Sequence, residues 1–442
     1  MFIGGTFGVM NTNFFFMNLL RKRASGCSPG VYSVCSANPI VIEASMDQAR
    51  ADGCPLLIEA TSNQVNQYGG YTGMKPEDFA AFVRDIAANS GFNSENLMLG
   101  GDHLGPLVWK HMPEEDAMLR AEELVACYVT AGFTKIHIDT SMKLGGDPID
   151  LTLPDELIAE RGARLCAAAE AASSSSSLPV YVIGSEVPAP GGASEKNDTL
   201  VPTTTKPAEF KASYDVFRSA FEQKGLKSAL KRIVAFVVQL GVEFRGDTVF
   251  YYDRDAAAAL CASLSDLPYP LFFEGHSTDY QRPESLAMMV EDGIGILKVG
   301  PGLTYALREG LMALEHIERE LAGSHDFRLS NFMDTLDDTM KADDSNWKNH
   351  YHGNEESLRL QRRYSLFDRA RYYLPVDSVE KAVNTLLGNL EQVNIGLPLL
   401  SQYLPKSLEK IRRGELETSP RALLKDCVRN ALAPYAKACF RR

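Results

Sequence analysis

Several short hydrophobic segments of this chain end in ionisable and polar residues. Four such endings are Glu59 to Thr61, Gly101-Asp102-His103, His137 to Ser141 and Glu274-Gly275-His276. Carboxylates and imidazoles are the side chains that most often transfer protons near neutral pH, and both also bind divalent metals. Burying so many of them without partners would cost several kcal/mol each. We therefore expect them to line a solvated site that performs acid–base chemistry.

His103, Glu186 and His276 are the predicted metal ligands. Two imidazoles and a carboxylate from separate segments suit a divalent cation such as zinc. Such an ion would act as a Lewis acid on a sugar carbonyl or an enediolate. The two histidines lie far apart in the sequence and form no motif, so the sequence predicts at most a weakly bound metal.

Three carboxylates are the predicted catalytic residues. They are Asp102, Asp139 and Glu59. Asp102 is adjacent to His103, so it could move a proton while the imidazole binds the metal. Because side chains alternate between the two faces of a strand, His137, Asp139 and Ser141 should share one face.

A further group of residues is predicted to bind a polyhydroxylated or phosphorylated ligand. They are Gln64, Asn66, Gly70, Ser141, Gln239, Lys298 and Gly300. Amides and glycine backbone donors in segment 63–73 suit such a ligand, although an ordinary Asn/Gly turn would have the same composition. Gly300 precedes a predicted helix start, where an anion could bind, but a structural turn is an equal alternative.

Two lysines raise separate questions. Lys298 could be a Schiff-base nucleophile, as in one mechanistic class of aldolases, but a lysine at the end of a strand more often binds an anionic group. Lys135 stands at the start of its segment, away from the predicted site, and we expect its side chain to be solvated.

The elements that must position these residues alternate between β-rich and helical segments. The β-rich segments are Val31 to Ala37, Pro55 to Ala60, Asn96 to His103, Lys135 to Ser141, Pro179 to Glu186, Arg232 to Leu240, Leu271 to Ser277 and Ile296 to Gly302. This alternation predicts an α/β fold with a parallel sheet, and an open doubly wound sheet is the alternative. We predict a (β/α)8 TIM barrel, because eight strands close a barrel and no GxGxxG follows the first strand.

Beyond the barrel, the strand signals stop. We predict an N-terminal tail or helix over residues 1–27, the barrel over 28–325 and a helical C-terminal subdomain over 326–442. In a barrel of this type the active site lies at the C-terminal ends of the strands. The polar strand endings should therefore meet there.

Composition excludes several classes of function. The 442 residues are 45% hydrophobic and 23% charged, as in a globular protein. A net charge of −12 without a basic stripe argues against a nucleic-acid partner. The cysteines are scattered with no CxxC pair, which favours reduced thiols in the cytoplasm. No segment approaches the ~20 uninterrupted apolar residues of a membrane span.

Long motifs along the chain resemble the GatZ/KbaZ family, the second subunit type of class II D-tagatose-1,6-bisphosphate aldolases, formerly labelled tagatose 6-phosphate kinases. The matching stretches are SVCSANP (33–39), LLIEATSNQVNQYGGYTGM (56–74), LGGDHLGP (99–106), AGFTKIHIDTSM (131–142), VIGSEVPAPGG (182–192), EGHSTDYQ (274–281), LKVGPGLTYALRE (297–309), RYSLFDRARYY (363–373) and SQYLPK (401–406). The resemblance covers nearly the whole chain from about Leu19.

The resemblance implies tagatose, galactitol or N-acetylgalactosamine catabolism, a sugar phosphate ligand and no nucleotide. It also implies a class II aldolase catalytic subunit of the GatY/KbaY type as partner, and a homo-oligomer is a further expectation. Asp102-His103 resembles the Asp-His pair of class II aldolases that supplies an acid–base group and a zinc ligand, and Asp139 to Ser141 resembles their Asp-x-Ser. Their sixth strand ends in a zinc-binding histidine, where this chain has Gln239.

Three functions follow from these observations. The incomplete set of histidines favours a non-catalytic subunit that stabilises an aldolase. The polar strand endings favour the alternative, a metal-dependent aldolase or C4 epimerase acting on ketohexoses or their phosphates. The kinase is the weakest hypothesis, because the sequence contains no GxxxxGK[ST] loop and no other nucleotide motif.

Overall fold

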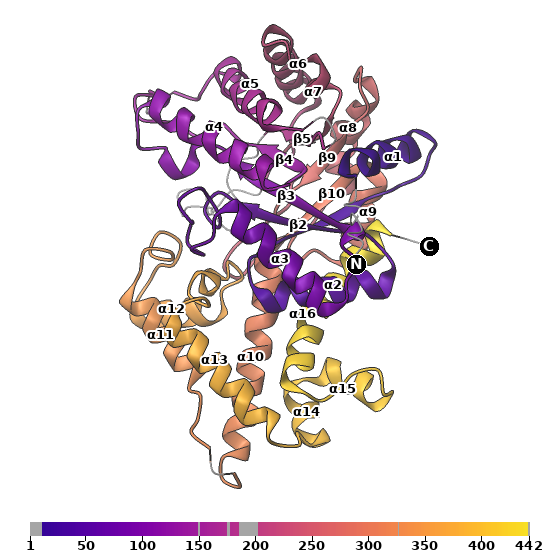
Figure 1. Cartoon of the computed structure of the whole chain (residues 1–442). Helices are drawn as coiled ribbons and strands as arrows, with labels where there is room; N and C mark the ends of the chain where they lie inside the picture. The colour runs from indigo at the N-terminus through magenta and orange to yellow at the C-terminus, as the bar shows by residue number, and fades with distance from the viewer. Residues whose placement is uncertain (1–10, 149–150, 175–176, 185–201, 326, 441–442) are drawn as a thin grey trace, which may run out of the picture.

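Runs of aliphatic and β-branched residues form the strands, because parallel strands covered on both faces must be apolar almost throughout. The computed structural model describes residues 11–148, 151–174, 177–184, 202–325 and 327–440. Eight parallel strands close into a barrel in the order β1-β10-β9-β6-β5-β4-β3-β2 (Figure 1). They are β1 (Val31–Cys35), β2 (Leu56–Thr61), β3 (Leu97–Leu104), β4 (Lys135–Ile138), β5 (Val180–Ile183), β6 (Ile233–Val237), β9 (Phe272–Gly275) and β10 (Ile294–Val299). Each lies in a predicted β-rich segment or overlaps one, which confirms the (β/α)8 barrel.

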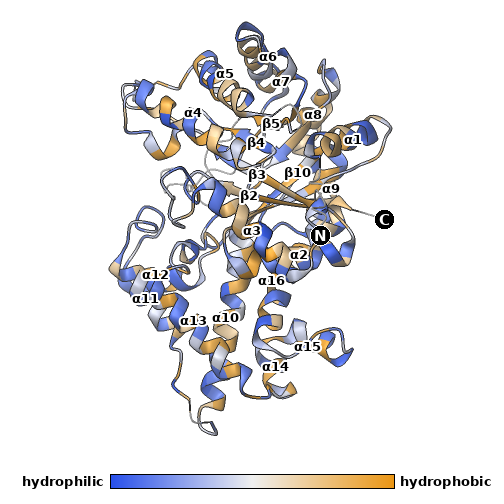
Figure 2. Ribbon diagram, in the orientation of Figure 1, coloured by the Kyte–Doolittle hydropathy of each residue, from blue (hydrophilic) through white to orange (hydrophobic). Residues whose placement is uncertain are grey.

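Helices follow the strands and surround the barrel. They are α2 (Pro39–Asp52), α3 (Pro76–Ser90), α4 (Glu114–Thr130), α5 (Asp155–Ala172), α6 (Pro207–Gln223), α7 (Lys227–Leu230), α8 (Arg254–Ala262), α9 (Pro283–Asp292) and α10 (Pro301–Leu321). Local chemistry sets the ends of α2: the Asn38 side chain accepts the N–H of Ile40, Pro39 is the first helical residue, and Gly53 ends the helix with a φ of 61°. Figure 2 shows hydrophobic strands at the centre and hydrophilic outer faces on the helices.

A hairpin of β7 (Glu243–Phe244) and β8 (Val249–Phe250) follows β6. Its strands are two residues long. A period of two cannot be recognised in so short a segment.

The N-terminal segment forms helix α1 (Thr12–Ala24), which packs on the barrel next to β5 and β6. Phe16, Leu19 and Leu20 are buried in one cluster with residues of the barrel strands, including Val31 and Leu57. These two residues lie at the amino-terminal ends of β1 and β2. The helix therefore covers the end of the barrel opposite the predicted site, and a ligand must enter from the other end.

The C-terminal part is helical, as predicted. Its helices are α11 (Phe332–Ala342), α12 (Glu355–Tyr364), α13 (Asp377–Glu391), α14 (Leu397–Tyr403), α15 (Pro405–Arg412) and α16 (Pro420–Cys439), with a 3-10 turn at Arg369–Tyr372. Figure 1 shows α10 running away from the barrel and α11, α13 and α14 gathered around it. Among the described residues, no helix is both long enough and apolar enough to cross a membrane.

The chain then returns to the barrel through α16. This helix packs against α2, α9, α10 and β1. A Cβ atom added at Gly310 of α10 would lie 2.9 Å from Leu424 of α16, so the two helices approach closely. Lys425 of α16 forms ion pairs of 2.8 Å with Glu43 and Asp47 of α2. A helix of the C-terminal extension therefore covers the side of the barrel between α9 and α2.

Candidate active site

The polar strand endings meet in a cavity of about 310 Å³ at the carboxyl ends of the barrel strands. The predicted site residues on its wall are Gln64, Asp102, His103, Asp139, Ser141, His276, Lys298 and Gly300. Further wall residues include Cys35, Tyr71, Asp279, Arg371 and Tyr372. The structure thus brings together residues from both ends of the sequence, including two from the C-terminal extension.

Some predicted residues lie elsewhere. Asn66 and Gly70 shape the loop after β2: the Asn66 amide bonds to the Ser62 carbonyl, and a Cβ atom on Gly70 would collide with the Gln64 carbonyl. Gln239 is outside the cavity wall, and its side-chain oxygen accepts the N–H of Gly241 two residues later. Glu59 is fully buried rather than on the wall.

Glu186, the predicted carboxylate ligand of the metal, lies outside the described residues.

An irregularity near the end of β3 places two consecutive residues at the site. The pairing of β3 with β4 shifts register between Gly101 and Leu104, and His103 has a φ of 46°. In a regular strand, Asp102 and His103 would point to opposite faces. The bulge breaks that alternation, so both side chains line the cavity. Such left-handed backbone in a residue other than glycine is costly and often occurs at functional sites.

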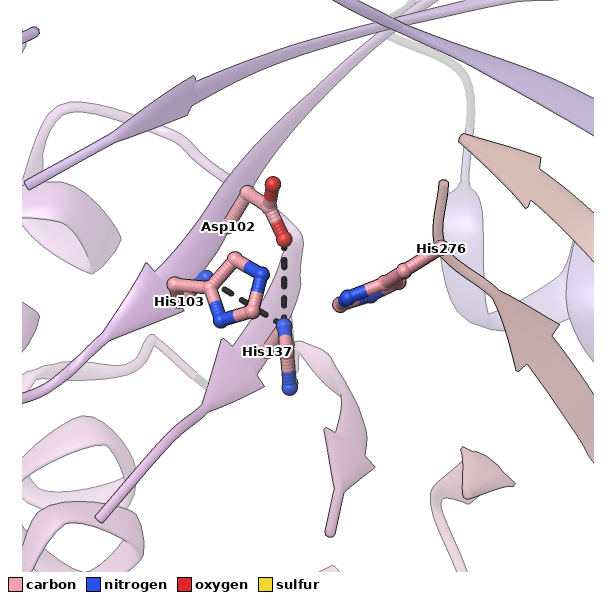
Figure 3. A group of neighbouring side chains, drawn as sticks. All are labelled: Asp102, His103, His137 and His276. Carbon is pink, nitrogen blue, oxygen red and sulfur yellow. Dashed lines mark hydrogen bonds and ion pairs between the residues drawn. The ribbon is translucent and has the colours of Figure 1, made fainter. Parts of the chain in front are cut away.

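Three imidazoles gather beside the Asp102 carboxylate. Their ring centres are 4.7 Å apart for His103 and His137, 4.6 Å for His103 and His276, and 5.2 Å for His137 and His276. Asp102, His103, His137 and His276 each offer one ligand atom, and these atoms lie within 4.8 Å of one another. Figure 3 shows His276 reaching in from β9, opposite the three residues of β3 and β4.

Each imidazole uses one nitrogen to bond an acceptor behind it. His103 Nδ1 is 2.8 Å from Asp139 Oδ2, and His276 Nε2 is 3.1 Å from Glu274 Oε1. These nitrogens must carry the proton, because carboxylates accept. The other nitrogens, His103 Nε2 and His276 Nδ1, are buried with no hydrogen-bond partner. A metal-binding histidine usually donates one N–H to a carboxylate and binds the metal through its other nitrogen, and His103 and His276 have this arrangement.

His137 differs from the other two imidazoles, because both of its nitrogens already have partners. Its Nε2 is 3.2 Å from the Gly184 carbonyl and therefore donates, while its Nδ1 accepts the backbone N–H of His103 at 3.2 Å. The same Nδ1 lies 3.0 Å from Asp102 Oδ1, so two acceptors face each other. A cation between them would satisfy both. The free lone pairs of His103 and His276 therefore fit a divalent metal, with Asp102 as a third ligand and His137 beside it in the same cluster.

The charges around the site set its protonation. Burial lowers the pKa of His276 to about 3, so this imidazole is neutral near pH 7. Burial also disfavours the charged form of His103, but the carboxylates of Asp102 and Asp139 outweigh it and raise the pKa of His103. Burial opposes ionisation of Asp102 as well, yet Lys298 and the neighbouring imidazoles hold the pKa of Asp102 well below its usual range. Asp102 is therefore a carboxylate.

Two lysines and two glutamates form a buried ionic layer beneath the imidazoles. Lys135 Nζ lies 2.7 Å from Glu59 and 2.6 Å from Glu274, and all three side chains are fully buried. Lys298 pairs with Glu59 and lies 2.7 Å from Asp102. The expectation that Lys135 is solvated is therefore wrong. The Lys135 side chain, at the start of β4, points into the barrel, where two carboxylates stabilise its charge.

Cys35, Glu59 and Asp102 form a second group of side chains that lie close enough together to bind a cation. The cation that these carboxylates bind is the Lys298 ammonium. Burial favours the neutral amine, but the surrounding acids, Asp102 first, raise the pKa of Lys298 well above its usual range. A Schiff-base nucleophile must be neutral, so this environment disfavours the Schiff-base hypothesis.

The N-terminus of α10, predicted as an anion site at Gly300, holds a carboxylate of the chain itself. Asp279 Oδ1 accepts the N–H of Gly300 at 3.0 Å and that of Gly302 at 2.7 Å. Asp279 is buried, and burial raises its pKa to about 6. The backbone donors at this helix end are therefore already satisfied.

Arg371 and Tyr372 were not among the predicted site residues. They reach the cavity on the 3-10 turn Arg369–Tyr372, within the RYSLFDRARYY motif. The density of arginine and tyrosine in that motif is the signal that could have indicated them. The sequence does not show that this segment, which lies far from the barrel strands along the chain, folds back over their C-terminal ends.

Two solved structures illustrate what the chain is similar to. A crystal structure described as a probable tagatose 6 phosphate kinase from Sinorhizobium meliloti 1021 is 45% identical, with a TM-score of 0.85 over 93% of this chain and 100% of the other. A putative fructose-1,6-biphosphate aldolase from Coccidioides immitis is 16% identical, with a TM-score of 0.44 over 84% of this chain and 98% of the other.

The family model of the D-tagatose-1,6-bisphosphate aldolase subunit GatZ/KbaZ-like proteins matches residues 16–440. The match spans the barrel, the histidine cluster and the C-terminal helices that deliver Arg371. Residues that are distant in sequence but meet in the cavity therefore all fall within one family pattern. The chain belongs to the GatZ/KbaZ-like family of D-tagatose-1,6-bisphosphate aldolase subunits.

Proposed function

We propose that this protein is a metal-dependent aldolase or C4 epimerase that acts on a ketohexose or its phosphate. The supporting observation is the cluster of three imidazoles beside Asp102, of which His103 and His276 are each held by a carboxylate on one nitrogen and have a free lone pair on the other. The argument for a purely non-catalytic barrel rested on a missing third histidine at Gln239. His137 supplies that third imidazole from β4.

The residues around the imidazoles have distinct roles in this proposal. A bound divalent metal such as zinc would polarise a carbonyl or hydroxyl oxygen of the sugar. The Asp102 carboxylate accepts the proton of a substrate hydroxyl as the neighbouring carbon–carbon bond breaks, and it returns the proton when a bond re-forms. The electron pair of the broken bond passes to the ketone carbonyl as an enediolate. Protonation of the enediolate carbon by the acid form of Asp102 releases the two fragments (aldol cleavage), whereas re-formation of the bond on the opposite face of the aldehyde, with the proton returning to the new C4 oxygen, gives the C4 epimer.

Two predicted catalytic carboxylates have supporting roles instead. Asp139 is occupied by His103 and by both the N–H and the hydroxyl of Ser141, so it orients the imidazole. Glu59 is enclosed by Lys135, Lys298 and the Ser33 hydroxyl, and it sets the charge balance beneath the site.

The second candidate function is the non-catalytic one, a subunit that stabilises a separate class II tagatose-bisphosphate aldolase. The description of the family as aldolase subunits favours it. In that case the galactitol, N-acetylgalactosamine or tagatose route is the metabolic setting, and the catalytic subunit is the partner. Both candidates place the protein in carbohydrate metabolism.

Metal analysis combined with an assay separates the two candidates. We expect the purified protein to bind about one divalent ion per chain through the histidine cluster, and a chelator to remove both the ion and the turnover of tagatose 6-phosphate or tagatose 1,6-bisphosphate. The assay is run with and without a class II catalytic subunit. Turnover by this chain alone supports the enzyme. Activity that appears only with the partner, and that survives chelation of this chain before mixing, supports the stabilising subunit.

We expect no ATP-dependent phosphorylation of tagatose 6-phosphate. Among the described residues that line the cavity, the one glycine is Gly300, and its N–H already bonds to Asp279, so no series of glycine N–H donors faces the cavity to bind a triphosphate. The measurement is transfer of labelled phosphate from ATP, with a known sugar-phosphate kinase as positive control. Turnover that copurifies with this chain through two chromatographic steps would contradict the expectation.

A further inference from the structure

We infer that Arg371 binds a terminal oxyanion of the substrate, a phosphate monoester or a carboxylate, at the outer wall of the cavity. This inference rests on the proposed function, because it names the substrate class of the same site. It assigns a recognition role to the C-terminal extension and explains why a segment outside the barrel reaches the strand ends.

The first observation concerns the place where an anion would otherwise bind. Phosphate groups in barrels of this type often bind at a helix N-terminus after the last strands. In this chain Asp279 already accepts the N–H groups of Gly300 and Gly302. A phosphate at that position would lose these donors and would face a carboxylate. The oxyanion must therefore bind elsewhere on the wall.

The second observation is the state of the Arg371 guanidinium. Its Nη1 donates to the carbonyls of Phe367 at 2.5 Å and Asp368 at 3.1 Å, and its Nη2 donates to the Tyr372 hydroxyl at 3.2 Å. A guanidinium has five N–H donors, so two remain, on Nε and Nη2. No carboxylate of the described residues lies within ion-pair distance of Arg371. The remaining donors suit two oxygens of one anion.

The surroundings of Arg371 add positive potential. The guanidinium carbons of Arg369 and Arg371 lie 4.6 Å and 4.7 Å from the centre of the Tyr372 ring. Tyr71 packs against the same ring at 4.9 Å. Neither guanidinium forms an ion pair with a carboxylate of the described residues, so an anion that binds at Arg371 would displace no acidic side chain.

Arg371 also lies between two neighbouring cavities. It lines both the cavity of the histidine cluster and a neighbouring cavity of about 260 Å³, together with Cys35, Gln64 and Tyr71. The sugar therefore extends from the histidines toward the boundary between the two cavities, with its charged end at the guanidinium.

Binding measurements without turnover test this inference. The ligands are tagatose 6-phosphate, the matching hexuluronate and uncharged tagatose, and affinity is measured by calorimetry. For wild type we expect the phosphate or the hexuluronate to bind more tightly than tagatose. The better of the two anions identifies the natural oxyanion. Equal affinity for all three ligands would overturn the inference.

Variants then locate the contact. Arg371→Met should weaken binding of the preferred anion roughly 10- to 100-fold and leave tagatose unchanged. Arg369→Met is the matched control, because Arg369 stacks on the same ring but does not line the cavity. Arg371→Lys keeps the charge without the paired donors, should lose part of the affinity, and serves if the methionine variant does not fold. Equal losses for the anion and for tagatose would contradict the assignment.

The outcome is independent of catalysis. If the anion binds through Arg371 but no turnover is found, the proposed reaction fails and the anion site stands. If turnover is found but Arg371→Met and Arg371→Lys bind the anion as wild type does, the reaction stands and this inference fails.

Discussion

Replacing His103 with alanine, or Asp102 with asparagine, is expected to lower sugar-phosphate turnover by ~10²- to 10⁴-fold, the usual effect of losing an acid–base group. His103→Ala removes one of the two free imidazole lone pairs, so metal content should fall with activity. Asp102→Asn removes the proton acceptor and one ligand atom but keeps the side-chain size. Steady-state kinetics and metal analysis of the same preparations measure both effects, with circular dichroism as the check on folding.

The control for these variants is His111→Ala. His111 is exposed and lies outside the cavity wall, so its loss should change neither metal content nor turnover. A stabilising subunit predicts a different pattern: His103→Ala and Asp102→Asn would still raise the activity of a co-expressed catalytic aldolase to the wild-type level. If both variants unfold, the polar strand endings are structural, and the proposed enzyme loses its main support.

Lys135→Met is expected to destabilise the fold by about 3–5 kcal/mol, the usual cost of removing one partner from a buried ionic group. The change leaves Glu59 and Glu274 fully buried without the ammonium between them. Urea unfolding followed by circular dichroism measures the loss as a lower midpoint. Lys110→Met, at an exposed lysine, should leave the midpoint unchanged.

A second variant shows whether charge causes the loss. In Lys135→Met, Glu59 keeps Lys298 as a partner, whereas Glu274 loses its closest ammonium, so adding Glu274→Gln should restore part of the stability. No recovery would indicate that the packing of the lysine stem matters more than its charge. A single Lys135→Met variant as stable as wild type would show that the layer is not a stabilising feature.

The barrel could be predicted because its signal is local. Each strand is a short apolar segment followed by an amphipathic one, and the number of repeats is sufficient to indicate closure. Asp102, His103 and His276 could be selected for the same reason, since they stand at the ends of such segments. Their chemistry follows from residue type and from the rule that barrel sites lie at the strand ends.

The remaining features depend on contacts that a linear pattern does not contain. His137 was predicted to share a face with Asp139, but its place in the imidazole cluster depends on the Gly184 carbonyl and on the bulge at His103, which the sequence pattern does not show. Lys135 was misjudged because its partners come from β2 and β9. Gln239 occupies the expected place in the sequence, but its side chain caps a turn. Arg371 reaches the cavity only because the C-terminal extension folds back over the strand ends, which the sequence pattern does not show.

The packing of α16 between α9 and α2 bears on how the chain acquires its structure during synthesis. Every barrel strand is translated before Pro420, the first residue of this helix. Until α16 docks, the faces of α2 and β1 that it covers remain open to solvent. Contacts of such long sequence separation form slowly and leave intermediates prone to aggregation. The outer face of β1 can therefore be covered by α16 only after every strand of the barrel has been synthesised.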